Sequence, residues 1–384
     1  MENVGTSANQ LIQLDSNGKI PAVDGSLLTG ITSGLSGSSD PTLSTNPSTG
    51  VGTKFKNTTD GEIFICTDAT AGSIVWINVG AGTGNISPFY FTSTNTYGFC
   101  GMGYGESPTG NWPRIDRIAF ASDTISDNGD TTLSRRGVAS SSSTSHSYAV
   151  GGYTSASAYV NTMDKYAMAS PANSTDVGDL GRTTDKGGSG TSEGYGYKFG
   201  SGTNSGVTYI YRWSHTSDGN STDWASLVSA KGGSMGGSSS THGYCLGDQY
   251  GSAAVKESID KIAWASGGTS TDIGNLTISS APVAAQSTDG YVYATGRATS
   301  GSTDIQKIST ASDGNAVARG GALYITRAAQ GGGCSSKTYG YTMGGASGPY
   351  TNIVCKFAFA TTADSTDVGD LADARGEQPC QGQY

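Results

Sequence analysis

Histidine and aspartate are the residues of this 384-residue sequence that could bind a metal ion or act as acid and base. His146 and His242 each lie two residues before a tyrosine, and Asp289 lies two residues before Tyr291. This shared spacing places the three side chains at one register position of a repeated strand. A metal site would need the three strands to be neighbours, and their order along the chain argues against that. We therefore predict hydrogen-bonded polar groups at strand ends, and no metal site.

Pairs of aspartates offer another possibility, a general acid and a general base. The sequence DVGDL contains such a pair twice, at Asp176 and Asp179 and again at Asp367 and Asp370. A catalytic pair is expected once, whereas a turn that every structural unit needs is repeated. Asp accepts a hydrogen bond from the backbone of its own turn, and Gly adopts positive φ there. We therefore predict that these aspartates stabilise turns.

Sequence signatures of catalysis are absent. The chain contains no G-x-S-x-G, no phosphate-binding P-loop, no H-E-x-x-H and no EF-hand loop. Without such a motif or a single carboxylate cluster, the protein is predicted not to be an enzyme and to need no cofactor.

One short segment, in which a basic residue follows an apolar and a polar one, returns six times. Its copies begin at residues 115, 163, 210, 259, 305 and 354, in steps of 48, 47, 49, 46 and 49 residues. A second segment, an aromatic residue followed by small residues and glycine, keeps the same interval. Its aromatic residues are Phe99, Tyr148, Tyr197, Tyr244, Tyr291 and Tyr341. A nearly constant interval indicates six copies of one structural unit.

Each unit contains four short strand signals separated by turns rich in Gly, Ser and Asp. Four strands of about five residues form a small antiparallel sheet that cannot bury both faces alone. Copies arranged around an axis can do so, and a period of about 40–50 residues with four strands is typical of a propeller blade. We predict an all-β fold in which residues 87–384 form a six-bladed β-propeller. Residues 374–384 should pair with the blade of Phe99 and Ile115, because no seventh copy follows them.

The basic residue of the first segment recurs in every copy. Its six positions are Arg117, Lys165, Arg212, Lys261, Lys307 and Lys356. We predict that these side chains form a repeated ion pair or carbonyl contact between neighbouring blades.

The segments that follow the glycine-ended strand differ between units, and in a propeller they all lie on one rim. They carry the aromatic residues Trp112, Tyr153, Tyr159, Tyr250 and Tyr350. Such side chains stack on sugars or anchor protein interfaces, although exposed turns also carry them without any ligand. These five residues are the candidate binding residues.

The order of these motifs resembles the kelch repeat. A basic residue and glycine precede segments such as GYTMGG at 340–345, and segments such as IDKIAWAS at 259–266 follow. The resemblance covers residues 89–384. It departs from kelch on the outer strand, where a tryptophan is expected and this chain has DVGDL. That variant resembles repeats in virion proteins of tailed bacteriophages.

The N-terminal part does not repeat. Its segment ANQLIQLDSNGKIPAVDGSLLTGI at 8–31 resembles segments near the attachment end of phage fibre proteins. The apolar residues there are too sparse for a monomeric core, which implies a homotrimer or docking on a virion through residues 1–35. We predict a linker at 36–51, a small β module at 52–80 and a joint at 81–86.

Composition excludes several classes of protein. The net charge of −9 argues against a nucleic-acid partner. The absence of a run of 18 apolar residues predicts no membrane insertion, and the polar N-terminus lacks the apolar core of a secretory signal. The six cysteines occur singly, which favours reduced and mostly buried thiols.

With the resemblance, these observations favour a structural protein of a bacteriophage virion. It would be a tail fibre or fibre-like appendage whose propeller attaches to a glycan or protein of the host surface. Other virion proteins would bind its N-terminal segment, and assembly would take place in the bacterial cytoplasm. A head or capsid fibre or decoration protein is the alternative within this class. A propeller glycan hydrolase or lyase is the alternative from another class.

Overall fold

The computed structural model describes residues 34–71, 73–79, 96–106, 109–202, 206–250, 257–278, 281–288, 290–297, 301–328, 331–346, 348–377 and 380–382. Their regular structure consists of β-strands alone, which confirms the all-β prediction. Within these ranges there is no helix of the length and apolarity needed to cross a membrane. The chain divides into two compact units, Met1–Pro88 and Phe89–Tyr384. Nearly all of the expected docking segment and the whole of the expected joint lie outside the described residues.

The first unit contains a four-stranded sheet of order β1-β2-β3-β4. The strands are β1 (Leu35–Gly37), β2 (Lys54–Asn57), β3 (Ile63–Asp68) and β4 (Val75–Asn78). Alternation along β2 and β3 buries Phe55, Phe64 and Cys66, which pack with Trp76. Strand β1 runs parallel to β2 and overlaps the segment that we expected to be a linker. The sheet therefore begins earlier in the chain than the predicted module.

The second unit contains six sheets of one plan, each with four strands in antiparallel order, and we number them by their second strands. Sheet 1 consists of β34 (Cys380–Gly382), β5 (Tyr97–Gly101), β8 (Arg114–Ala119) and β9 (Thr124–Asp130). Sheet 2 consists of β11 (Ala139–Ser142), β12 (His146–Val150), β14 (Val160–Ala167) and β15 (Thr175–Thr184). Sheet 3 consists of β16 (Gly188–Thr191), β17 (Tyr195–Phe199), β18 (Val207–Ser214) and β19 (Thr222–Lys231). Sheet 4 consists of β20 (Met235–Ser238), β21 (His242–Leu246), β22 (Ser258–Ala263) and β24 (Thr271–Asn275). Sheet 5 consists of β25 (Ala284–Ser287), β26 (Tyr291–Thr295), β27 (Ile305–Ser309) and β28 (Val317–Ala318). Sheet 6 consists of β29 (Gly332–Ser335), β30 (Tyr339–Met343), β31 (Ile353–Ala358) and β32 (Thr366–Asp370).

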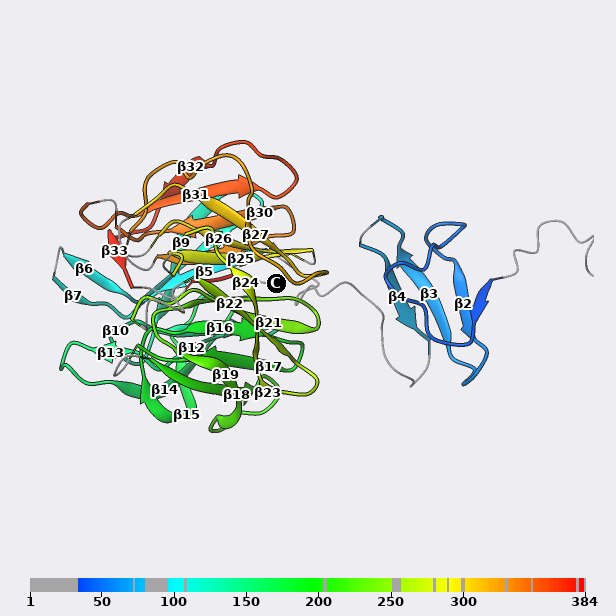
Figure 1. Ribbon diagram of the computed structural model, residues 1–384, viewed down its shortest axis with the longest axis horizontal. Coiled ribbons are helices and arrows are strands. Elements are labelled where there is room, and N and C mark those ends of the chain that lie inside the picture. The colour runs from blue at the N-terminus through cyan, green and yellow to red at the C-terminus, as the bar shows by residue number, and fades with distance from the viewer. Residues whose placement is uncertain are drawn as a thin grey trace, which may run out of the picture. The chain divides into compact units, whose positions relative to one another are not determined.

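Short additional strands lie beside these sheets (Figure 1). They are β6 (Tyr104–Glu106), β7 (Thr109–Asn111) and β33 (Arg375–Gly376) in one small sheet, β10 (Arg135–Arg136) with β13 (Tyr153–Thr154), and β23 (Gly268–Thr269) beside β19. Apart from β23, each precedes the first strand of a sheet or follows its second strand. Because those two strand ends adjoin in an antiparallel pair, these short strands gather at one end of the sheets.

The first strands of successive sheets contact one another in the order β11, β16, β20, β25, β29 and β34, and β34 also contacts β11. Small residues make this approach possible. A Cβ atom at Gly236 would overlap the backbone of Ser189 in the neighbouring first strand, and one at Gly333 would overlap that of Ala285. Larger apolar side chains therefore occupy the second and third strands, where they pack between adjacent sheets.

The aromatic residue of each second strand pairs in register with the recurring basic residue of the third strand. In sheet 5 the aromatic residue is Tyr293, which lies opposite Lys307, and not the expected Tyr291. Tyr291 lies opposite Ser309, at the position that His146 has in sheet 2. The segment GYVY has two tyrosines on one face of the strand, so spacing alone selected the wrong one.

Three of the recurring basic residues make the ion pair to the next sheet that we predicted. These pairs are Lys165 with Asp218, Lys261 with Asp313, and Lys356 with Asp123. In the alternate sheets no such ion pair is found among the described residues, and the cation lies over a tyrosine ring of its own sheet, as Lys356 also does over Tyr339. Those contacts are Arg117 over Tyr97, Arg212 over Tyr195, and Lys307 over Tyr291. Ion pairs from this basic residue to the next sheet thus occur in alternate sheets.

Buried ion pairs hold three first strands to their sheets. A cation shortly before the first strand reaches an aspartate of the third strand, with both side chains excluded from solvent. The pairs are Arg135 with Asp164 at 2.6 Å, Lys231 with Asp260 at 3.2 Å, and Arg375 with Asp116 at 2.6 Å. Loss of one partner from such a pair costs about 3–5 kcal/mol because the other charge stays buried.

The C-terminal end of the chain forms the first strand of sheet 1, as predicted: β34 pairs antiparallel with β5. Cys100 of β5 is disulfide-bonded, so the prediction of reduced thiols is wrong for this residue. In the register, Cys380 lies opposite Cys100. The other described cysteines, Cys66, Cys245, Cys334 and Cys355, are free and buried. Single spacing along the chain could not reveal the disulfide, because β34 meets β5 only after folding.

Deletion of residues 372–384 should destabilise the second unit by several kcal/mol. It removes β34 from the edge of β5, and it leaves the buried Asp116 with Arg114, 2.8 Å away, but without the fully buried Arg375. Chemical denaturation of both proteins measures the effect, with reductant present so that the disulfide at Cys100 does not contribute. An unchanged midpoint would contradict this role of the C-terminal strand.

The stability of the protein should rise with pH through the titration of Lys198. Burial lowers the pKa of this β17 residue to about 8, against an opposing effect of Asp185. Between that value and the unfolded pKa of about 10.4, the unfolded chain binds more protons, so raising the pH favours the folded state. Relative to Lys198→Met, the wild type should therefore gain free energy of unfolding between pH 8 and pH 10. Exposed Lys337→Met is the control, and a difference that stays constant with pH would refute this assignment.

Candidate functional site

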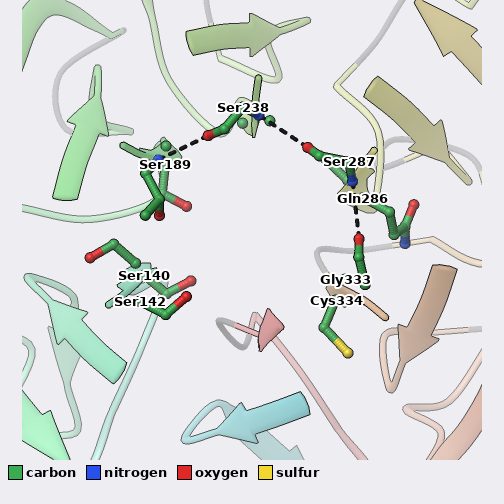
Figure 2. Close-up of a pocket in the computed structure, with 15 residues that line it drawn as sticks. Ser140, Ser142, Ser189, Ser238, Gln286, Ser287, Gly333 and Cys334 are labelled. Carbon is green, nitrogen blue, oxygen red and sulfur yellow. Dashed lines mark hydrogen bonds between the residues drawn. The ribbon is translucent and has the colours of Figure 1, made fainter. Parts of the chain in front are cut away.

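A narrow polar cavity lies between the first strands of five sheets (Figure 2). The backbone N–H of one strand donates to the serine Oγ of the next: Thr191 to Ser238 at 2.9 Å, Ser238 to Ser287 at 3.0 Å and Ser287 to Ser335 at 3.0 Å. These bonds fix the small hydroxyl side chains that line the cavity. Its volume of about 60 Å³ has room for a few water molecules but not for an ordinary organic ligand.

A second cavity of about 60 Å³ shares Ser140 and Ser189 with the first and adds Lys186 and Glu377. The second cavity therefore lies at the end of the sheets where charged side chains gather. The backbone N–H of Gly137 donates to the carbonyl of Glu377 at 2.7 Å, and that of Lys186 donates to Gly137 at 2.6 Å. Lys186 and Glu377 both have positive φ, 33° and 54°, a conformation that costs free energy and is often found at functional sites.

Glu377 forms ion pairs with two cationic side chains at this position. Its carboxylate lies 3.0 Å from Lys186 Nζ and 3.1 Å from Arg136 Nε. Burial works to lower the pKa of Lys186, but Glu377 and Tyr250 together raise it above its ordinary value. The ammonium group therefore stays charged at neutral pH.

Tyrosine rings surround these charged groups. The guanidinium of Arg136 lies 4.7 Å from the centre of the Tyr104 ring and 5.3 Å from that of Tyr153. Tyr350 lies beside Tyr104, with ring centres 5.9 Å apart, and Tyr159 lies 5.0 Å from Tyr153. We call the connected set the mouth cluster: Tyr104, Arg136, Tyr153, Tyr159, Lys186, Tyr250, Tyr350 and Glu377.

The structure thus connects four of the five aromatic residues predicted from sequence. Tyr250 belongs to the network through its hydroxyl, which accepts a hydrogen bond from Lys186 Nζ at 2.7 Å, and 39% of its surface is exposed. Tyr159 is 44% exposed. The fifth residue, Trp112, follows β7 and lies against Gly105, so it covers the hairpin that carries Tyr104.

Sequence reasoning missed the charged members of the mouth cluster. Arg136 and Lys186 precede first strands, and Glu377 precedes β34 at the end of the chain. These positions follow the outer strands in sequence and did not stand out as variable loops. The shared place before a first strand was the signal that could have identified them.

The two histidines are hydrogen-bonded, as predicted. His146 Nδ1 lies 2.8 Å from the hydroxyl of Ser145, and His242 Nδ1 lies 2.8 Å from that of Thr241. Burial, followed by the nearby lysine of the third strand, lowers the pKa of both rings. Asp289, the third residue considered for a metal site, lies outside the described residues.

The DVGDL segments lie in strands β15 and β32, so the prediction that they form turns is wrong. The predicted contact between Asp and the nearby backbone is present all the same, beside irregularities in the strand register. Gly178 N–H donates to the Asp176 carboxylate at 3.1 Å, and Gly369 N–H donates to Asp367 at 3.0 Å. Both glycines have φ values that disfavour other residues, 146° and 142°. These carboxylates are therefore used by the backbone.

One acidic group in the first unit has the spacing of a cation site. Asp40, Asp60 and Glu62 offer oxygens within 4.8 Å of one another. Asn57 donates to Asp40 and Asp60, each at 2.8 Å, which already satisfies part of this group.

Comparison with protein-family models and with curated protein sequences finds no match. The function must therefore be argued from the geometry. Partly exposed rings, two cations and a carboxylate at one end of the sheets form a surface that can stack on and hydrogen-bond a polar ligand.

Replacement of Glu377 by Gln should lower the pKa of Lys186, because Glu377 is the charged group that raises it. The measurement is a pH titration of the Lys186 side chain by NMR. Glu193→Gln, at an exposed turn, is the matched control. An identical Lys186 titration in wild type and Glu377→Gln would exclude the ion pair in solution.

Proposed function

We propose that the six sheets form a closed six-bladed β-propeller. The proposal is supported by the cyclic order of contacts among first strands, in which β34 contacts both β29 and β11. It is also supported by the origin of β34, which comes from the C-terminal end and pairs with β5 near the start of the unit. Such pairing of the two ends is how a propeller avoids open strand edges.

We further propose that the protein is a virion structural protein of a bacteriophage that recognises the host surface through this propeller. The observation that carries the recognition role is the mouth cluster. Its tyrosines come from segments after the second strands of sheets 1, 2, 4 and 6, and Arg136 lies between two of the rings. Rings with exposed faces beside fixed charges suit sugars and polar protein surfaces.

The virion location is supported by two resemblances in the sequence. The repeats with DVGDL resemble those of tailed-phage virion proteins, and residues 8–31 resemble fibre segments near an attachment end. In this proposal residues 1–35 bind other virion proteins in a homotrimer, and the propeller is displayed as a tail fibre or fibre-like appendage. A head fibre or decoration protein would use the same parts at another place on the particle.

The test uses phage particles that carry this chain, together with their host cells. Gold-labelled antibodies against the full chain should label the tail in electron micrographs. Fluorescent full-length protein should bind host cells, and Tyr104→Ala with Tyr153→Ala should reduce that binding at least tenfold, because two rings of the mouth cluster are lost.

Tyr195→Ala with Tyr291→Ala is the matched control, since these exposed tyrosines also lie under cations but outside the mouth cluster. Labelling of heads would favour the alternative location. Particles without label would refute the virion role, and equal cell binding by both double variants would refute recognition by the mouth cluster.

A further inference from the structure

Sheet 3 lacks the buried ion pair of sheets 1, 2 and 4. Thr184 stands four residues before β16, just as Arg135 stands four residues before β11. Tyr211 lies opposite the second-strand residue Lys198, as Asp164 lies opposite Ala149 in sheet 2. Two hydroxyl side chains therefore occupy the positions of a buried cation and its carboxylate.

A groove of about 450 Å³ lies at these two residues. Threonine is much shorter than arginine, so Thr184 fills less space at this position than Arg135 does in sheet 2. The lining includes Tyr159 and Arg182 from the sheet 2 side, and Val207 and Tyr209 from β18. This volume lies within the range of about 300–1,000 Å³ that is usual for small-molecule sites.

The floor of the groove has polar groups that the protein does not satisfy. Thr184 is 3% exposed, and its Oγ1 has no hydrogen-bond partner among the described residues. Tyr211 is 2% exposed, and its hydroxyl makes no bond of good geometry within the same ranges. Burial raises the pKa of Tyr211, and Arg182 is close enough to offset part of the rise. Unsatisfied buried hydroxyls cost free energy, which a ligand with hydroxyl groups would recover.

The walls supply an apolar face and one positive charge. Arg182 lies over the half-buried Tyr209 ring, 4.7 Å from its centre, and its guanidinium also reaches Tyr211. The Arg182 side chain is exposed, and a guanidinium can bind a carboxylate in a two-pronged geometry. Tyr159 adds a second ring at the edge. Asp223 is the nearby acidic group, opposite Tyr211 in the sheet.

We propose that this groove binds an acidic sugar, a pyranose ring that carries a carboxylate. The C–H face of the sugar packs on Tyr209, its hydroxyls bond Thr184 and Tyr211, and its carboxylate bonds Arg182. The groove is separate from the mouth cluster except at Tyr159, and binding there does not depend on the virion role.

Saturation-transfer NMR of the full chain with glucuronic acid, galacturonic acid, glucose and galactose tests the proposal. At least one acidic sugar should bind about tenfold more tightly than its neutral counterpart. Arg182→Gln should remove that preference, and Thr184→Val should weaken binding severalfold. No transfer to either acid, or equal binding of acidic and neutral sugars by the wild type, would overturn the proposal.

Two further variants separate the groove from its surroundings. Thr184→Arg with Tyr211→Asp recreates the pair of sheet 2 and should abolish binding by closing the groove. Arg212→Gln, which removes the cation over Tyr195 at 4.4 Å, should leave sugar binding unchanged. A loss in Arg212→Gln equal to that in Arg182→Gln would contradict the site. Host-cell attachment is tested with variants of the mouth cluster, and sugar binding is tested with variants of the groove. A negative result in one experiment therefore leaves the other proposal standing.

Discussion

Close contact between the first strands is the constraint on which the rest of the second unit depends. At Gly236 and Gly333 the backbone of one strand occupies the space of a neighbour's Cβ. Only glycine, serine and other small residues fit there, and the serine hydroxyls accept backbone N–H bonds between strands. The large side chains must then pack between sheets on the second and third strands, which explains the high glycine content beside a tyrosine-rich core.

Because the side chains of the first strands are so small, side chains outside these strands must hold them to their sheets. Buried pairs such as Arg135 with Asp164 do this in three sheets, where each charge satisfies the other. Sheet 3 follows a different solution, with Lys198 buried in β17 and hydroxyls at Thr184 and Tyr211. The departure from the repeat leaves both a groove and unsatisfied polar groups, and such local exceptions are where functional sites are expected.

The same geometry explains why binding residues gather at one end of the sheets. The segments before first strands and after second strands adjoin there, so Arg136, Lys186 and Glu377 meet the rings of Tyr104 and Tyr153. Positive φ at Lys186 and Glu377 shows that the backbone is held in an unfavourable conformation to present these side chains. Glu377 comes from the chain end that supplies β34, so this surface depends on the pairing of β34 with β5.

The sequence by itself determined the repeat interval, the contact between Asp176 and the Gly178 N–H in DVGDL, and the return of the C-terminal strand to β5. These features depend on local spacing and on side-chain alternation, which a linear pattern records. Only the tertiary structure decided that Tyr293 replaces Tyr291 in the register, because both tyrosines lie on one face of their strand. It also decided the disulfide at Cys100, the meeting of Glu377 with two cations, and the groove beside Thr184. The ion pairs of Glu377 and the groove join residues of different sheets, and their separation is set by how the sheets pack, which no repeat pattern encodes.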